Sequence, residues 1–448
     1  MTVSRQLSNE GRLGANFFFS RQQNRGHSRD FFTTLARHLA NLSLEFRSLV
    51  SNAIADHHDF AQKAFQEQWQ WLLLEPLKKC RSFWAPLVIV IDALDECDSE
   101  RAAEEILELL GEYEDPGQLP LRILITSRPE EPGFDRIRNT MRRVDLHEAQ
   151  DSEKDILLFL EDELSRIRKR RGASADWPGK AKIDLLAQKA GKLFIYAATV
   201  CRFIDVRRYY DDRLTAILKE DTTGLEELHN IYTRILETAA FHDVPKDKME
   251  EARTELNGII AAAVALFSPL SVIGLTEFLP CPVTKVKDYL SNLGSIIAVS
   301  DGDSQVRIFH LSLRDFFLDV KREDKRFWAS EPEVHRNLVD RCLKIMSATL
   351  KMDVCSVREI DYLSSSNDQS LIKEYLPEHV QYACRYWIRH LEQSDRLHHE
   401  EVLRFLKKHF LHWLEALSLI GQVSEGVLMI NALYNMPTVR DSAAPYEF

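Results

Sequence analysis

The stretch Pro86-Leu-Val-Ile-Val-Ile-Asp92-Ala-Leu-Asp95-Glu96-Cys97 decides how the first part of this 448-residue sequence folds. Its continuous apolar run predicts a strand that is buried on both faces, as the strands of parallel sheets are. Acidic residues follow at once, so their carboxylates are expected at the carboxyl edge of the sheet, where ligands of such folds bind. The alternative is a strand that ends in a solvated acidic turn, and the run taken alone does not decide between the two.

A second apolar run ends in polar residues further along the chain. It reads Leu121-Arg-Ile-Leu-Ile-Thr-Ser-Arg128 and predicts another buried strand. Arg128 is expected at the same sheet edge as Asp92, where its planar donors suit a γ-phosphate. Taken alone, Arg128 is more typical of a surface residue, and the acidic strand before it shifts the interpretation toward a site.

Strand and helix patterns alternate in the first third of the chain. Leu13–Phe19 is a further strand candidate and Arg143–Leu146 a weaker one, while helical spacing covers Asp30 to Val50 and Phe60 to Cys80. Strands that alternate with helices indicate an α/β sheet. The expected fold class is therefore α/β, followed by an α-helical remainder in which the apolar spacing is helical.

One segment of the helical remainder has a different pattern. Three helical stretches precede two strand candidates, Ser295–Ser300 and Gln305–His310, with a turn signal at Asp301-Gly302-Asp303. Three helices followed by a hairpin resemble a winged helix, and the balanced charges of Thr284–Leu290 favour a packing or regulatory wing over a DNA-binding one. The expected domains are 1–150, 151–248, 249–325 and 326–448.

The composition excludes several classes of protein. Net charge is −11, so a broad nucleic-acid-binding surface is not expected. No apolar stretch reaches the roughly 20 residues that cross a bilayer, so no membrane partner is expected. The seven cysteines are scattered without a Cys-x-x-Cys pair, which argues against a zinc site or a disulfide framework and favours a reducing, cytoplasmic location.

Four motifs, in this order, carry a resemblance to a known family. PLVIVIDALDEC, LRILITSRPEE, GKLFIYAATVCRFI and VRIFHLSLRDFFLD resemble the NACHT module of fungal signal-transduction NTPases, and the N-terminal region is similar to that of nephrocystin-3. The resemblance implies a P-loop-NTPase-like parallel sheet, a helical lid, a winged helix and a C-terminal helical domain. It also implies a switch between ADP and ATP, bound with Mg, and homo-oligomers or complexes with relatives in fungal self/non-self recognition or cell death.

The resemblance also assigns roles to individual residues. Asp92 matches the magnesium-binding aspartate of the Walker B motif, and Asp95 and Glu96 match the acids that orient the attacking water. Arg128 matches the sensor arginine. His310 matches the winged-helix histidine that contacts the ADP β-phosphate in the resting state, although a histidine at the end of a strand has no such role by itself.

One expected motif departs from the family pattern. A Gly-rich loop with Lys and Ser or Thr should precede the Leu13–Phe19 strand and hold the phosphates. The Gly-Lys pairs of the sequence, Gly179-Lys180 and Gly191-Lys192, lie in helical regions and lack a following Ser or Thr. The sheet is therefore expected to be incomplete and truncated before the Walker B half. ATP or ADP binding is expected to be weak or lost, and the protein is at most a weak NTPase.

Two other functions remain open at this stage. The first is a non-catalytic scaffold or decoy that binds full-length relatives through its helical parts. The second is a magnesium-dependent nuclease or phosphatase built on Asp92, Asp95 and Glu96. The second is disfavoured, because such sites draw further carboxylates from other strands and none stands out in the sequence.

Overall fold

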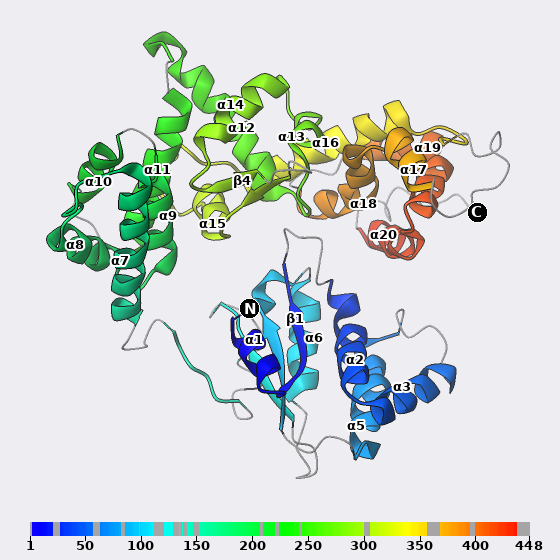
Figure 1. Ribbon diagram of the computed structural model, residues 1–448. Coiled ribbons are helices and arrows are strands. Elements are labelled where there is room, and N and C mark those ends of the chain that lie inside the picture. Colours follow the sequence, from blue (N-terminus) through cyan, green and yellow to red (C-terminus); the bar gives the residue numbers. More distant parts are fainter. Residues whose placement is uncertain are drawn as a thin grey trace. The chain divides into compact units, whose positions relative to one another are not determined.

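The computed structural model divides the chain into two compact units, Met1–Asp145 and Leu146–Phe448, and each is described by itself. Figure 1 shows that the first unit contains a sheet and that the second is almost wholly helical. The described residues are 2–20, 27–56, 63–81, 86–97, 99–111, 121–128, 134, 137, 141–146, 152–206, 209–219, 224–241, 244–299, 305–355, 368–394 and 399–436.

A three-stranded parallel sheet forms the centre of the first unit, in the order β1 (Leu13–Phe18), β2 (Leu87–Asp92), β3 (Leu121–Ile125). The expected parallel sheet is therefore confirmed. All the apolar residues of β2 are buried, as its continuous run predicts. The expectation of a strand buried on both faces is wrong for β3, where half-buried and exposed residues alternate. The reason is that one face of β3 packs against the core of the unit through Leu121, Ile123 and Ile125, whereas Arg122 and Leu124 on the opposite face are exposed.

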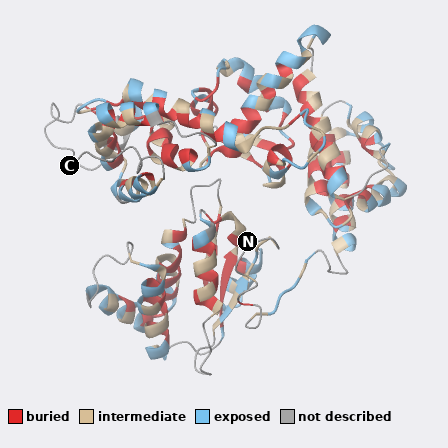
Figure 2. Cartoon of the chain, turned by 180° about the vertical axis from the view of Figure 1, so that it is seen from behind, coloured by how far each residue is buried: buried red, intermediate tan, exposed pale blue. Residues whose placement is uncertain are grey.

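One face of this sheet packs against helices. Alternate residues of a strand point to the same face, and those of β1 and β2 join the apolar residues of α2 (Phe31–Leu42) and α6 (Glu100–Gly111) in one core. Figure 2 shows buried strands in this unit beside helices that are buried on one side. Members of the core are Ala15, Phe17, Leu35, Leu39, Ile89, Ile91, Ala103 and Ile106.

The remaining elements of the first unit correct three expectations. The helix expected over Asp30 to Val50 is interrupted at Ser43, whose extended backbone ends α2 and whose Oγ accepts the N–H of Phe46 at 3.0 Å. The described part of the Phe60 to Cys80 helix contains a π-helical segment. The strand expected at 143–146 is not formed, and Val144 is 64% exposed there. The other helices are α1 (Thr2–Asn9), Ser28–Asp30, α3 (Leu44–Asp56), α4 (Phe65–Gln68), Trp69–Leu74, α5 (Glu75–Lys79) and Leu94–Glu96.

The second unit begins with five α-helices. Acidic residues in the first turn and basic residues in the last turn of α7 complement the helix dipole. Gly191, with φ of +56°, separates α8 from α9 in a backbone conformation that favours glycine. The helices are α7 (Ser152–Arg171), α8 (Lys180–Ala190), α9 (Phe194–Ile204), α10 (Tyr210–Leu218) and α11 (Leu225–Phe241).

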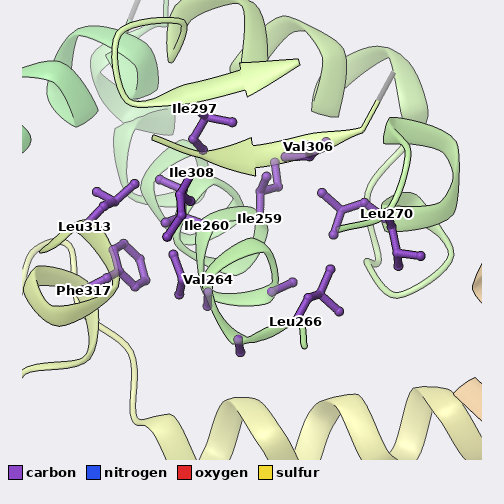
Figure 3. Close-up of a cluster of buried hydrophobic side chains, with 14 of the residues drawn as sticks. Ile259, Ile260, Val264, Leu266, Leu270, Ile297, Val306, Ile308, Leu313 and Phe317 are labelled. Atoms are coloured by element: carbon purple, nitrogen blue, oxygen red, sulfur yellow. The ribbon is translucent and has the colours of Figure 1, made fainter. Parts of the chain in front are cut away.

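A small antiparallel hairpin packs against helices in the middle of the second unit. The two expected strands are confirmed as β4 (Ile297–Val299) and β5 (Val306–Ile308), whereas the expected turn at 301–303 lies outside the described residues. Figure 3 shows Ile297, Val306 and Ile308 facing Ile259, Ile260 and Val264 of α12, with Leu313 and Phe317 of α15 beside them. The helices here are Lys246–Lys248, α12 (Met249–Ala265), α13 (Val272–Thr276), α14 (Val283–Asn292) and α15 (Ser312–Leu318).

The last described part of the chain, up to residue 436, is helical, as expected. It shares one continuous hydrophobic core with the rest of the second unit. Among the described residues, no helix combines the length and the apolar character that crossing a membrane requires. The helices are α16 (Glu331–Thr349), α17 (Asp368–Tyr375), α18 (Glu378–Glu392), α19 (His399–Leu419) and α20 (Val423–Asn435).

Candidate functional site

The candidate site lies at the carboxyl end of β2. Asp92 is the last residue of the strand, and its carbonyl oxygen accepts the N–H of Phe19 at 3.0 Å. Ala93 follows in the left-handed conformation, with φ of +55°. A side chain in this conformation costs of order 1 kcal/mol, and such backbone strain is concentrated at functional sites. The turn leads into the short helix Leu94–Glu96, which carries the next acids at the same edge.

Thr126 joins the ends of β2 and β3. Its hydroxyl donates to Oδ1 of Asp92 at 2.6 Å and accepts the N–H of Ala93 at 2.9 Å. Its backbone N–H donates to the carbonyl of Ile91 at 2.9 Å, and its own carbonyl accepts the N–H of Leu94 at 3.0 Å. Thr126 therefore fixes both the Asp92 carboxylate and the turn that follows it.

Sequence reasoning assigned no role to Thr126, although a signal for it was present. Ile91 pairs with Ile125 in the parallel register. The next residues along each strand, Asp92 and Thr126, therefore fall opposite each other. The signal is a Thr directly after one strand, in register with an Asp at the end of the neighbouring strand. The hydrogen bond between the two side chains can be inferred from this pattern.

The structure brings Arg128 to Asp95, at the sheet edge that Arg128 was expected to share with Asp92. Nε of Arg128 lies 3.2 Å from Oδ2 of Asp95, and the side chains are 38% and 15% exposed respectively. The backbone N–H of Arg128 also donates to Oδ1 of Asp95 at 3.3 Å. A guanidinium and a carboxylate therefore already neutralise each other in this arrangement.

Glu96 lies beside these residues. It is half-buried, and its backbone N–H donates to the carbonyl of Ala93 at 2.9 Å, which closes the short helix after β2. Asp92, Asp95, Glu96 and Arg128 are thus gathered at one edge of the sheet.

The donor set at this edge fits magnesium held mainly by water and phosphate. Magnesium is commonly bound through one or two carboxylates, several waters and the phosphates of a substrate. The half-buried Asp92 carboxylate, oriented by Thr126, is of this type. Among the described residues no group of three or more His, Cys, Asp or Glu side chains is arranged to hold a metal ion by itself. Asp95 is engaged with Arg128, which leaves Asp92 as the better candidate for a metal.

His310 lies in the second unit, on the corner between β5 and α15, and its side chain is exposed. Its Nδ1 accepts the backbone N–H of Ser312 at 3.1 Å and lies 2.8 Å from the hydroxyl oxygen of Ser312. The structure therefore gathers the acids and Arg128 in the first unit and places His310 in the second.

Comparison with known proteins finds similarity over the first unit and over most of the chain. The family "Nephrocystin 3, N-terminal" matches residues 1–128, which include all three strands, Asp92, Asp95, Glu96 and Arg128. The vegetative incompatibility protein HET-E-1 of Podospora anserina is 23% identical over 427 residues, which cover 87% of this chain. The chain spans 30% of the length of that relative. Both findings confirm the resemblance that the four ordered motifs predict.

Proposed function

We propose that this chain is part of a fungal signalling protein of the NACHT type, whose conformation responds to a bound nucleotide. The observation that carries the proposal is the polar edge of the sheet. There Thr126 orients Asp92, and Arg128 pairs with Asp95, in a segment that matches the nephrocystin-3 N-terminal family. The carboxyl edge of a parallel sheet is where such folds bind ligands.

The proposed domains follow the same scheme. The parallel sheet lies in the P-loop-NTPase-like domain, residues 1–150, and α7 to α11 form the helical lid domain, residues 151–248. The segment 249–325 is a winged helix, supported by the β4–β5 hairpin and by a further antiparallel bridge between Ser271 and Gln305. The helices of 326–448 form the C-terminal helical domain.

Each site residue has a proposed role. Asp92 would hold magnesium through water, where the ion would supply neutralisation of charge on the nucleotide phosphates. Glu96 or Asp95 orients water. Arg128, which pairs with Asp95 in this arrangement, turns to a γ-phosphate when one is bound. His310 donates to a phosphate of ADP in the resting state.

Hydrolysis is expected to be weak in this polypeptide. The 448 residues contain no Gly-x-x-x-x-Gly-Lys-Ser/Thr segment, so phosphates have no loop of that kind to hold them. A second function, a non-catalytic scaffold or decoy that binds full-length relatives, is favoured by the Arg128–Asp95 pair, which neutralises its own charges without a phosphate. The named relative is a vegetative incompatibility protein, so we propose that either function serves self/non-self recognition in a cytoplasmic assembly of related chains.

Thermal unfolding with and without nucleotide tests the proposal. A ligand that binds only the folded state at 100 times its dissociation constant stabilises it by about 2.7 kcal/mol. We expect Mg-ADP or Mg-ATP to raise the unfolding temperature of the wild type, and Asp92→Ala to abolish this shift. Asp162→Ala is the matched control, because Asp162 is an acid that is 63% exposed and paired with Arg166 on α7.

The outcome separates the two functions. A shift that Asp92→Ala removes and Asp162→Ala keeps supports the nucleotide switch. The opposite result is an unfolding temperature that millimolar nucleotide does not change, although the chain unfolds cooperatively and binds a full-length relative in a pull-down. This result refutes the nucleotide switch and supports the scaffold function.

A further inference from the structure

Two hydroxyl groups lie in line behind the exposed ring of His310. Nδ1 of His310 is 2.8 Å from Oγ of Ser312, and this Oγ is 2.7 Å from the hydroxyl oxygen of Tyr232. Ser312 begins α15, whereas Tyr232 lies on α11, 80 residues earlier in the chain. These hydrogen bonds therefore connect a buried side chain on α11 with an exposed side chain on the corner after β5.

The direction of every hydrogen bond in this line follows from one backbone group. The backbone N–H of Ser312 donates to Nδ1 of His310 at 3.1 Å. An amide N–H is always a donor, so Nδ1 presents its lone pair and the neutral ring carries its proton on Nε2. The Ser312 hydroxyl must then donate to Nδ1 as well. Its oxygen is left to accept the hydroxyl proton of Tyr232.

The side chain of Tyr232, the buried end of these hydrogen bonds, is fixed by packing. It is 1% exposed, and its ring meets Phe316 of α15 edge-on with centroids 5.4 Å apart. Burial raises the pKa of Tyr232, so the phenol keeps the proton that it donates.

A second helix of the same unit, α9, also contacts the corner between β5 and α15. Arg202 of α9 lies over the ring of Phe309, 4.5 Å from its centroid, and donates through Nε to the carbonyl of Ser295 at 2.8 Å. Phe309 directly precedes His310 in the chain. A residue of α9 therefore contacts the chain directly before His310, while a residue of α11 supports its ring through Ser312.

We propose that Ser312 and Tyr232 are positioning residues for His310, which hold its exposed ring in the Nε2–H form. That this Nε2–H serves a nucleotide phosphate rests on the proposed function, whereas the orientation of the ring does not. Because Tyr232 stands on α11, a shift of α11 away from the corner removes one support of the ring. The arrangement thereby couples the packing of the lid helix to the state of His310.

NMR of the ring nitrogens in the histidine-labelled full chain tests the proposal, with His310→Gln used to assign the signals. The wild type is expected in the Nε2–H form. A neutral hydrogen bond contributes about a fivefold factor, so Ser312→Ala should change the tautomer ratio of His310 about fivefold toward Nδ1–H. Tyr232→Phe should act in the same direction with a smaller effect, and Ser312→Thr, which keeps the hydroxyl, should restore the wild-type ratio.

Tyr289→Phe is the matched control. The hydroxyl of Tyr289 lies in the same unit, where it donates to Glu255 at 3.1 Å, so its loss should leave the His310 ratio unchanged. Thermal unfolding of each variant establishes that it is folded. A His310 ratio in Ser312→Ala equal to that of the wild type overturns the positioning role, whatever the nucleotide result. If the tautomer ratio of His310 changes in the variants as expected but Mg-ADP does not stabilise the chain, the positioning role is supported and only the nucleotide function is refuted.

Discussion

Thr126 and Asp92 lie opposite each other at the carboxyl ends of neighbouring parallel strands, and the Thr126 hydroxyl donates a 2.6 Å hydrogen bond to the Asp92 carboxylate. The same oxygen accepts the N–H of Ala93, whose left-handed backbone turns the chain away from the sheet. One hydroxyl thus orients a carboxylate and supports the strained turn beside it. The contact explains why the carboxylate of Asp92, at the end of β2, has a defined direction.

Replacing Thr126 by Val should destabilise the first unit. The substitution conserves shape but removes the donor to Asp92 and the acceptor for the N–H of Ala93. A lost hydrogen bond of this kind costs about 1–2 kcal/mol. Urea unfolding measures the change, and Thr126→Ser, which keeps the hydroxyl, is the control. Equal stability of Thr126→Val and wild type contradicts the role given to the hydroxyl.

Two glycines should respond in opposite directions to alanine. A Cβ at Gly14 would lie 3.1 Å from Cβ of Leu87 and 3.3 Å from Leu39, and overpacking of this kind costs about 1–3 kcal/mol. Gly258, on the exposed side of α12, has nothing within 4 Å of such a Cβ. Gly258→Ala should therefore stabilise by up to about 1 kcal/mol through helix propensity. Denaturant unfolding of both variants measures the two changes in stability. A stabilising Gly14→Ala would contradict the prediction and show that Leu87 and Leu39 can move to accommodate a Cβ beside β1.

The buried ion pair between α8 and α11 should be costly to break. Nζ of Lys189 lies 2.6 Å from Oε1 of Glu227, and the side chains are 4% and 1% exposed. Removing one partner of a buried pair costs about 3–5 kcal/mol, because the other charge stays in the interior. We expect this loss for Lys189→Met in chemical unfolding.

An exposed pair between α8 and α10 is the matched control for Lys189→Met. Lys182 lies 3.3 Å from Asp211, with side chains 39% and 55% exposed. Lys182→Met should cost less than about 1 kcal/mol. The double variant Lys189→Met, Glu227→Leu should recover much of the stability lost in the single one. Equal losses for Lys189→Met and Lys182→Met would show that burial does not govern the first pair.

Acid should destabilise the second unit through a buried histidine pair. Nδ1 of His390 lies 2.7 Å from Nδ1 of His335, and Nε2 of His390 lies 2.7 Å from the hydroxyl of Tyr382. Burial first, and then His335, Arg389 and Arg314, lower the pKa of His390 well below 6.5. The fold therefore favours the neutral ring, so the contribution to stability is complete above pH 6.5 and is lost as the pH falls below that value.

Unfolding at a series of pH values measures this effect. The slope below pH 6.5 should contain up to about 1.4 kcal/mol per pH unit from His390, and His390→Gln should remove that part. A slope that is the same in His390→Gln and wild type would assign the acid sensitivity to other groups.

The local features of the chain were predictable because they depend on neighbouring residues. The apolar run before Asp92 predicts β2, and the run before Arg128 predicts β3. Residues at the carboxyl ends of parallel strands meet at one edge, so the shared edge of Arg128 and Asp92 was predictable, whereas the pairing of Arg128 with Asp95 was not. The uninterrupted helix over Asp30 to Val50 was wrong, since one hydroxyl at Ser43 caps a new helix there and periodicity does not register a cap.

The sequence by itself determined β1, β2 and β3, their parallel sheet, the acids at the carboxyl end of β2, and the resemblance that the comparisons confirm. Only the tertiary structure decided which distant side chains meet. Lys189 joins Glu227 across 38 residues, His335 joins His390 across 55, and Tyr232 joins Ser312 across 80. The physical reason is that strand formation depends on the apolar pattern within a few residues. A contact between two helices depends instead on how both pack into a shared core, which no local pattern records.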